Sequence, residues 1–196
     1  MVPASLEIRA FICVDLPAAV RRRAEELQRR LATCGADVNW VRKENLHLTL
    51  RFLGEISRHQ LESACAGTKR AAAGVEAFQL RFSGSGCFPS ERHPKVVWVG
   101  LAEIPQAILN LHVGIEQELV QAGFPCEERP FSPHLTLGRV RSSRNSSRLV
   151  ERLSATEFNS ETFLVREVVV MKSELKSSGA VYTPIERVEL KQQRFD

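Results

Sequence analysis

Residues 45–50 read NLHLTL and residues 133–137 read PHLTL, so His-Leu-Thr-Leu occurs twice in a chain of 196 residues. A repeat of four common residues is weak evidence by itself. Its surroundings strengthen it, because each copy follows a helical pattern and is flanked by segments rich in β-branched and aromatic residues. The matching order of elements predicts an internal duplication in which the two copies hold equivalent positions.

The segments around the two copies mix strand and helix patterns without a regular β-α alternation. Besides the two copies, the expected strands are residues 8–14, 37–41, 78–82, 96–101, 163–171 and 181–190. The expected helices are residues 16–31, a helix that a capping box of Ser57 and Gln60 begins, and residues 105–121. Residues 83–95 have the composition of a loop. We expect one α+β domain over residues 1–196, with largely antiparallel sheets and helices outside.

Composition excludes some classes of protein and leaves others open. Apolar residues make up 43% of the chain, which is enough for a globular core, and apolar runs such as residues 168–171 are too short to span a bilayer. No secretory signal is visible in the first ten residues, so we expect a cytoplasmic protein, without a membrane partner and monomeric. The five scattered cysteines indicate neither a disulfide frame nor a zinc site. A net charge of +4 permits a phosphate-bearing partner without requiring one.

Side chains alternate between the two faces of a strand, so each copy buries its leucines on one face. The other face of the first copy carries His47, Thr49 and Arg51, and that of the second carries His134 and Thr136. If an approximate two-fold axis relates the halves, these two faces meet across one groove. Alternation therefore places all five side chains in a common cleft.

Paired histidines suit the cleavage of a phosphodiester. In-line attack requires a proton taken from the nucleophile and a proton given to the leaving oxygen, and histidine performs either task near neutral pH. Threonine hydroxyls can donate to phosphoryl oxygens, and an arginine can balance the developing charge. No metal is required, and clusters of metal ligands are missing near both copies. A lone histidine on a strand is more often a structural residue that bonds locally, but two in the same context favour a site.

On these residues the sequence resembles the 2H phosphoesterase superfamily, and within it the RNA 2′,3′-cyclic phosphodiesterases, also called the 2′-5′ RNA ligase family. The similar stretches are residues 9–17, 40–55, 86–90, 129–140 and 173–185. The resemblance implies a bilobal fold in which duplicated halves line a positively charged central cleft. It also implies hydrolysis of RNA 2′,3′-cyclic phosphate ends to 2′-phosphomonoesters, without metal or other cofactor. Some members join RNA ends through a 2′-5′ bond, so the direction of the reaction stays open.

The resemblance also implies roles for individual residues. By matching position, His47 is the proton donor to the released 3′-oxygen, and His134 is the proton acceptor that activates water. Thr49 and Thr136 bind the phosphate, and Arg139 matches a basic position that supports it. The acid and base labels come from the resemblance, because sequence alone does not distinguish two histidines in identical contexts.

Further contacts and other functions remain open at this point. Phe11 and Tyr182 are candidates for stacking on a base, although core packing is the stronger expectation for Phe11. A non-catalytic module that binds RNA ends in the same cleft is an alternative function. An enzyme for small cyclic nucleotides is another.

Overall fold

The structure, a computed structural model, describes residues 7–177 and 179–192. The strands are β1 (Ile8–Asp15), β2 (Val38–Trp40), β3 (His47–Ile56), β4 (Phe78–Leu80), β5 (Phe82–Ser90), β6 (His93–Leu101), β7 (Leu135–Val140), β8 (Phe163–Val165), β9 (Glu167–Lys176) and β10 (Gly179–Glu189). The helices are α1 (Ala18–Ala32), α2 (Arg58–Ala73), α3 (Gln106–Gln121) and α4 (Ser146–Ser154), with a 3₁₀ turn, η1 (Lys43–Asn45), before β3.

Eight strands form one sheet in the order β10-β9-β1-β3-β7-β6-β5, with β2 paired to β7, while β4 and β8 form a separate pair. Every paired strand runs antiparallel to its neighbour, which confirms the predicted α+β class with antiparallel sheets. The two predicted sheets are continuous here, joined where Leu48 of β3 pairs with Leu135 of β7. Because this junction is so short, the sheet divides into two parts that lean away from each other.

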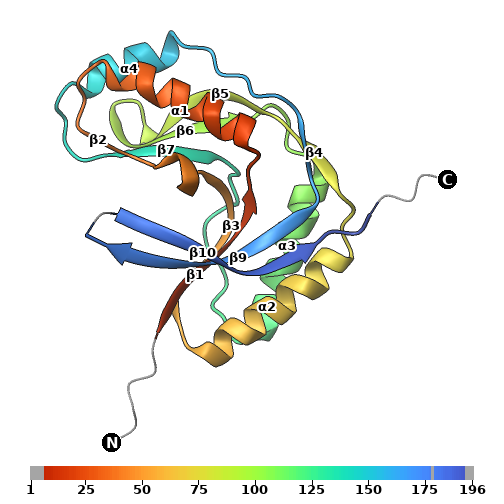
Figure 1. The fold of residues 1–196 in the computed structure, drawn as a ribbon. Coiled ribbons are helices and arrows are strands. Elements are labelled where there is room, and N and C mark those ends of the chain that lie inside the picture. The colour runs from red at the N-terminus through yellow and green to blue at the C-terminus, as the bar shows by residue number, and fades with distance from the viewer. Residues whose placement is uncertain (1–6, 178, 193–196) are drawn as a thin grey trace, which may run out of the picture.

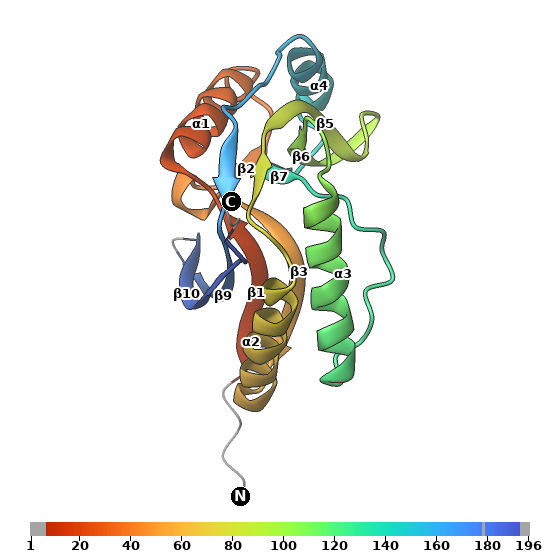
Figure 2. The same ribbon diagram turned by 90° about the vertical axis from the view of Figure 1, so that its right-hand side faces the viewer.

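The two parts of the sheet define two lobes (Figure 1). The lower lobe contains β1, β3, β9 and β10, covered by α2 and α3, and the upper lobe contains β2, β5, β6 and β7, covered by α1 and α4. Two helices pack on a different lobe from the strand that precedes them. Helix α1 follows β1 of the lower lobe but packs on the upper lobe, and α3 follows β6 of the upper lobe but packs beside α2 (Figure 2). Each lobe therefore combines strands from both halves of the chain with one helix from each half.

Local sequence explains the ends of two helices. The Ser57 hydroxyl accepts a hydrogen bond from the Gln60 backbone N–H, while the Gln60 side chain accepts one from Ser57, so the predicted capping box is present. Helix α3 buries its expected apolar face and ends before Gly123, whose φ of 86° suits glycine. These features explain why α2 and α3 begin and end where the periodicity indicates.

The prediction that residues 83–95 form a loop is wrong. Strands β5 and β6 form a hairpin there, with Gly86 opposite Trp98. A Cβ atom on Gly86 would lie 2.6 Å from the Trp98 ring, so glycine is required for the indole to lie across its neighbouring strand. Gly86, which suggests a loop by composition, here makes room for the Trp98 side chain. Helix α4, which buries Leu149 and Leu153, was also not expected.

The buried core is formed by the leucine ridges of β3 and β7, the apolar faces of the helices and the inner residues of β1 and β9. Within the described ranges, each helix is too short or too polar to cross a bilayer.

Candidate active site

The pairing of Leu48 with Leu135 brings the two His-Leu-Thr-Leu copies together. Both leucine side chains are fully buried in the core, so the residues on either side of them point to the opposite face. In this antiparallel register His47 is next to Thr136, and Thr49 is next to His134. The arrangement is close to two-fold symmetric about the leucine pair, as the predicted duplication requires.

A cleft of about 630 Å³ lies on that face. Six of the predicted site residues line it: Phe11, His47, Thr49, Thr136, Arg139 and Tyr182. The ring of His134 does not line this cavity but packs edge-on against Phe88, with ring centroids 5.0 Å apart. His134 therefore lies on the same face as the other residues, at the border of the cleft.

Each of the two imidazoles makes a hydrogen bond through Nδ1 to the backbone carbonyl two residues before it. His47 Nδ1 lies 2.6 Å from the carbonyl oxygen of Asn45, and His134 Nδ1 lies 2.7 Å from that of Ser132. A carbonyl oxygen only accepts, so each Nδ1 carries the proton and donates it. The neutral ring then has its lone pair on Nε2, which is the nitrogen left for proton transfer. Each histidine uses the carbonyl two residues before it, so the symmetry extends to the tautomer.

The pKa of each histidine lies below the ordinary value of 6.5. Burial is the main cause for His47; its bond to Asn45 and the Asp15 carboxylate oppose the shift, and Arg21 adds to it. Burial also lowers the pKa of His134, the Ser132 carbonyl opposes it, and the Arg139 guanidinium lowers it further. Near neutral pH the uncharged form of both rings is therefore favoured.

Aromatic side chains hold each imidazole in place. The Phe11 ring stacks on His47 with centroids 4.6 Å apart, and Tyr182 meets His47 edge-on at 5.4 Å. Phe11 is only 3% exposed and packs in a small cluster with residues of β1 and β9, as expected from core packing. Its face toward the cleft is taken by His47, so the structure gives Phe11 a supporting position.

The second histidine has an equivalent aromatic pair that the sequence analysis missed. Phe88 contacts His134 edge-on, and the Trp98 ring lies 6.4 Å from it. Phe88 and Trp98 also stack on each other at 4.9 Å. The resemblance included residues 86–90, but no pattern in the sequence relates this hairpin to His134.

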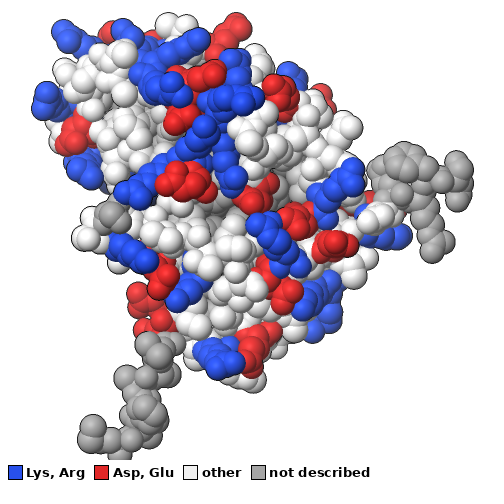
Figure 3. All heavy atoms as spheres, viewed as in Figure 1, with Lys and Arg blue, Asp and Glu red and all other residues white. Residues whose placement is uncertain are grey.

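The cleft wall is basic. Its charged members within the described part of the chain are Arg9, Arg42, Arg139 and Lys176. Arg139 lies close enough to lower the pKa of His134 and to oppose the burial that raises the pKa of the Tyr182 hydroxyl. Its charge therefore acts on both lobes. Lys and Arg side chains also gather over the upper lobe in the view of Figure 3, interspersed with some acidic side chains.

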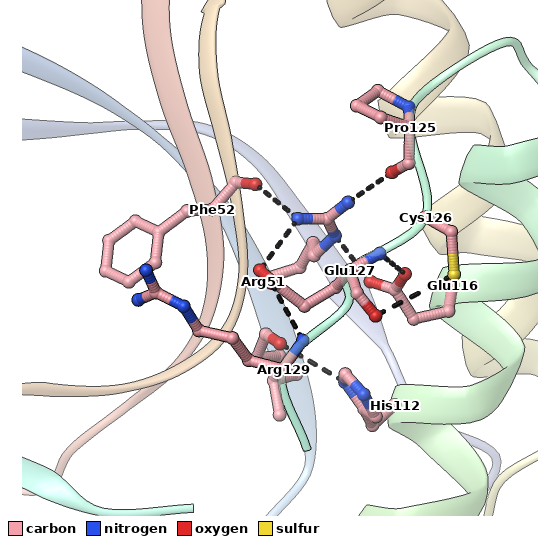
Figure 4. A network of polar contacts seen from close by, with 9 residues as sticks. Arg51, Phe52, His112, Glu116, Pro125, Cys126, Glu127 and Arg129 are labelled. Atoms are coloured by element: carbon pink, nitrogen blue, oxygen red, sulfur yellow. Dashed lines mark hydrogen bonds and ion pairs between the residues drawn. The ribbon is translucent and has the colours of Figure 1, made fainter. Parts of the chain in front are cut away.

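The prediction that Arg51 lies in the cleft is wrong. On β1, Cys13 pairs with Thr49, and Ile12, the residue before it, pairs with Arg51. Leu50 therefore has no partner and is the extra residue of a β-bulge. The bulge reverses the alternation, and Arg51 turns into the interior, where it is 9% exposed. Phe52 takes the cleft side instead. In Figure 4 the two neighbouring side chains point in opposite directions.

Arg51 instead ties β3 to the segment that leads to the second histidine (Figure 4). Its guanidinium pairs with Glu116 of α3 and with Glu127 at 3.2 Å, and donates to the Pro125 carbonyl at 2.6 Å. The Glu127 backbone N–H in turn donates to Glu116 at 3.3 Å. This network fixes the chain seven to nine residues before His134.

A second contact holds the same segment. The His112 ring on α3 stacks on Phe131 with centroids 4.0 Å apart, and its Nδ1 donates to the Leu50 carbonyl at 3.2 Å. Burial lowers the pKa of His112, which the Glu116 carboxylate opposes. His112 thus connects α3, the bulge in β3 and the segment before His134. Among residues 7–177 and 179–192, no group of three or more His, Cys, Asp or Glu is arranged to hold a metal ion.

Comparison with known proteins relates most of the chain to one family. The model of the LigT-like phosphoesterase family matches twice, over residues 14–98 and 99–182. Each match contains one His-Leu-Thr-Leu copy, which confirms the predicted duplication.

Curated relatives and solved structures agree with this match. The chain is 36% identical to an RNA 2′,3′-cyclic phosphodiesterase of Methanothermobacter thermautotrophicus over 92% of this chain and 98% of that protein. It is 31% identical to an RNA 2′,3′-cyclic phosphodiesterase of Thermotoga maritima over 89% of this chain and 91% of that protein. TT0787 of Thermus thermophilus superposes with a TM-score of 0.80 at 29% identity, covering 95% of this chain and all of that one. The structure of E. coli LigT complexed with 3′-AMP superposes with a TM-score of 0.77 at 26% identity, covering 95% of this chain and 99% of that one. With one His-Leu-Thr-Leu motif in each of the two matched regions, this chain belongs to the LigT-like phosphoesterase family.

Proposed function

We propose that this protein hydrolyses the 2′,3′-cyclic phosphate at the end of an RNA to a 2′-phosphomonoester. The observation that carries the proposal is the register of Leu48 with Leu135, which sets two His-x-Thr pairs side by side on one face. The names of two relatives, RNA 2′,3′-cyclic phosphodiesterases at 36% and 31% identity, support this substrate. The basic cleft wall supports an anionic one.

Hydrolysis needs one proton transfer on each side of phosphorus. In the proposed reaction, His134 Nε2 takes a proton from water as the water oxygen bonds to phosphorus. The bond from phosphorus to the 3′-oxygen breaks, and His47 Nε2, protonated, gives its proton to that oxygen. The phosphate stays on the 2′-oxygen. In each histidine the Nδ1 donates to a backbone carbonyl, which leaves Nε2 as the nitrogen that exchanges a proton with the substrate.

The electrostatics of the two sites favour these acid and base roles. Burial lowers the pKa of both histidines. At His47 the Asp15 carboxylate opposes this shift more strongly than the Arg21 guanidinium adds to it, whereas at His134 the Arg139 guanidinium adds to the shift. A ring beside a carboxylate is more readily protonated, as an acid must be. A ring beside a guanidinium is more readily neutral, as a base must be.

Three further side chains of the cleft wall support the charge that develops on phosphorus. The hydroxyls of Thr49 and Thr136 donate to the non-bridging oxygens, and the Arg139 guanidinium balances their charge. The same residues serve ligation if the 5′-hydroxyl of a second RNA attacks in place of water. The product is then a 2′-5′ linkage, and His134 accepts the hydroxyl proton. A monomer in the cytoplasm is part of the proposal, and the five unpaired cysteines are consistent with a reducing compartment.

The test is incubation of the purified protein with an oligonucleotide that ends in a 2′,3′-cyclic phosphate, followed by ³¹P NMR of the product. We expect a 2′-phosphomonoester, and His47→Ala and His134→Ala each lower the rate by at least about a hundredfold. His93→Ala, on an exposed residue outside the cleft, is the matched control. A product with the phosphate on the 3′-oxygen would overturn the proposed roles. Unchanged substrate that stays bound would instead indicate a non-catalytic RNA-end binding module.

A further inference from the structure

The bulge at Leu50 leaves an unusual side chain in the cleft. Phe52 is 56% exposed, and it lines the cleft wall. Among the large exposed apolar residues of the described chain, only Leu175 shares that location, and it is 72% exposed. An exposed aromatic ring is usually without consequence when it stands alone on a surface. Inside a basic cleft it is a flat apolar face next to cations, which is the combination that binds unpaired bases.

Phe52 lies beyond the histidine centre. Its ring centroid is 6.1 Å from that of Phe11, and Phe11 stacks directly on His47. The order along the lower lobe is therefore His47, Phe11 and Phe52. Phe52 is therefore separated from His47 by the Phe11 ring. This distance makes Phe52 a contact for a neighbouring part of the substrate.

Two cations share the cleft wall with Phe52. Arg9 and Lys176 are exposed and line the cleft with Phe52, Gly54 and Leu175. Arg9 is near enough to Tyr182 that its charge opposes the rise that burial produces in the pKa of that hydroxyl. Gly54, with a φ of 76°, has no atom within 4 Å of a Cβ built on it, so the floor beside Phe52 is open.

We propose that Phe52, with Arg9 and Lys176, forms a subsite for the second-to-last nucleotide of the RNA. The inference rests on the proposed function, because a cyclic phosphate at the histidines fixes where the strand end lies. The terminal nucleotide then connects to the rest of the strand only through its 5′-oxygen. The next base stacks on Phe52, and the phosphate joining the two nucleotides pairs with the cations. The preferred substrate is an oligonucleotide rather than a cyclic mononucleotide.

The first measurement compares kcat/KM for a 2′,3′-cyclic mononucleotide with that for a dinucleotide ending in the same cyclic phosphate. The wild type should prefer the dinucleotide by about 5- to 150-fold, the factor that stacking of one base on an aromatic ring supplies. Phe52→Ala should reduce that ratio to near one, and Phe52→Trp should keep it. Ile104→Ala, which removes a 51% exposed side chain outside the cleft, should leave the ratio unchanged.

A charge variant tests the phosphate contact separately. Arg9→Gln should weaken dinucleotide binding and reduce the slope of log K against log salt concentration by about one unit or less. Equal kcat/KM for the two substrates in the wild type would overturn the subsite while leaving the proposed function intact.

A binding measurement tests the subsite even if neither substrate is hydrolysed. The proposed function then fails, and calorimetric titration with a dinucleotide ending in a 2′-phosphate still tests the subsite. Phe52→Ala should weaken that binding at least fivefold. Equal affinity in the variant and the wild type would exclude stacking on Phe52.

Discussion

Leu48 of β3 and Leu135 of β7 lie opposite each other at the junction of the two lobes, and both side chains are fully buried. The pair belongs to the core, yet it determines the geometry of the cleft. Each leucine has a histidine on one side and a threonine on the other, so the register that buries the leucines also aligns the polar residues. Packing and chemistry therefore depend on the same contact.

Truncation of one member of this pair should affect both stability and activity. Leu135→Ala leaves a cavity between the lobes, and we expect a loss of about 2–5 kcal/mol in the free energy of unfolding, measured with urea. Leu164→Ala, at a 42% exposed position, should change it by less than about 0.5 kcal/mol. If Leu135→Ala kept wild-type kcat at a temperature where it is folded, the leucine pair would not govern the alignment of the histidines.

The pH dependence of kcat/KM should reflect the lowered pKa of both histidines. The base must be neutral, so activity rises as pH passes its pKa, and the acid must be protonated, so activity falls as pH passes its own. Because both pKa values lie below 6.5, the profile of the free enzyme should be centred below pH 6.5. Arg139→Gln removes a charge that lowers the pKa of His134. The ascending limb should move to higher pH, and a descending limb that moved instead would reverse the acid and base assignment.

Arg51 should matter for stability first. Arg51→Met leaves the largely buried carboxylate of Glu116 and the exposed carboxylate of Glu127 without their cation. We expect a loss of about 3 kcal/mol in the free energy of unfolding, mainly from the buried pair with Glu116. Activity should fall as well, because the segment before His134 loses its attachment to β3. Arg58→Met, which breaks an exposed pair with Glu62, is the control and should cost less than about 1 kcal/mol. Normal stability with weakened phosphate binding would instead place Arg51 in the cleft.

The threonine hydroxyls should act in the transition state. Thr49→Val and Thr136→Val keep the shape of the side chain and remove one donor, so each should lower kcat by about 100-fold, with a smaller effect on KM. Thr162→Val, exposed and outside the cleft, is the matched control. Steady-state kinetics with one cyclic-phosphate substrate measures both parameters. A change confined to KM would mean that the hydroxyls bind substrate and transition state equally.

Gly86 offers a test of the aromatic pair beside His134. Gly86→Ala puts a methyl group 2.6 Å from the Trp98 ring, which must move away from its stack with Phe88. We expect lower kcat, with a changed Trp fluorescence spectrum as the structural readout. Gly74→Ala, whose new methyl group would meet ordinary contacts at 3.7 Å, should leave both unchanged. Full activity despite an altered spectrum would show that the Trp98–Phe88 stack does not position His134.

Several features could be predicted from the sequence because they depend on neighbours along the chain. The capping box at Ser57 is formed by residues three apart, and the apolar face of α3 follows from helical periodicity. The hairpin of β5 and β6 could not be predicted in this way. Gly86 faces Trp98, and composition alone does not distinguish a glycine in a loop from one that accommodates a ring across a strand.

The sequence by itself determined the duplication, the α+β class and the presentation of a histidine and a threonine opposite each leucine ridge, because alternation along a strand is local. Tertiary structure decided which side chains reach the cleft. The bulge at Leu50 arises from the pairing of β3 with β1, and it turns Arg51 into the core and Phe52 into the cleft. A strand read alone does not contain its partner's register, so no local pattern could have predicted that reversal.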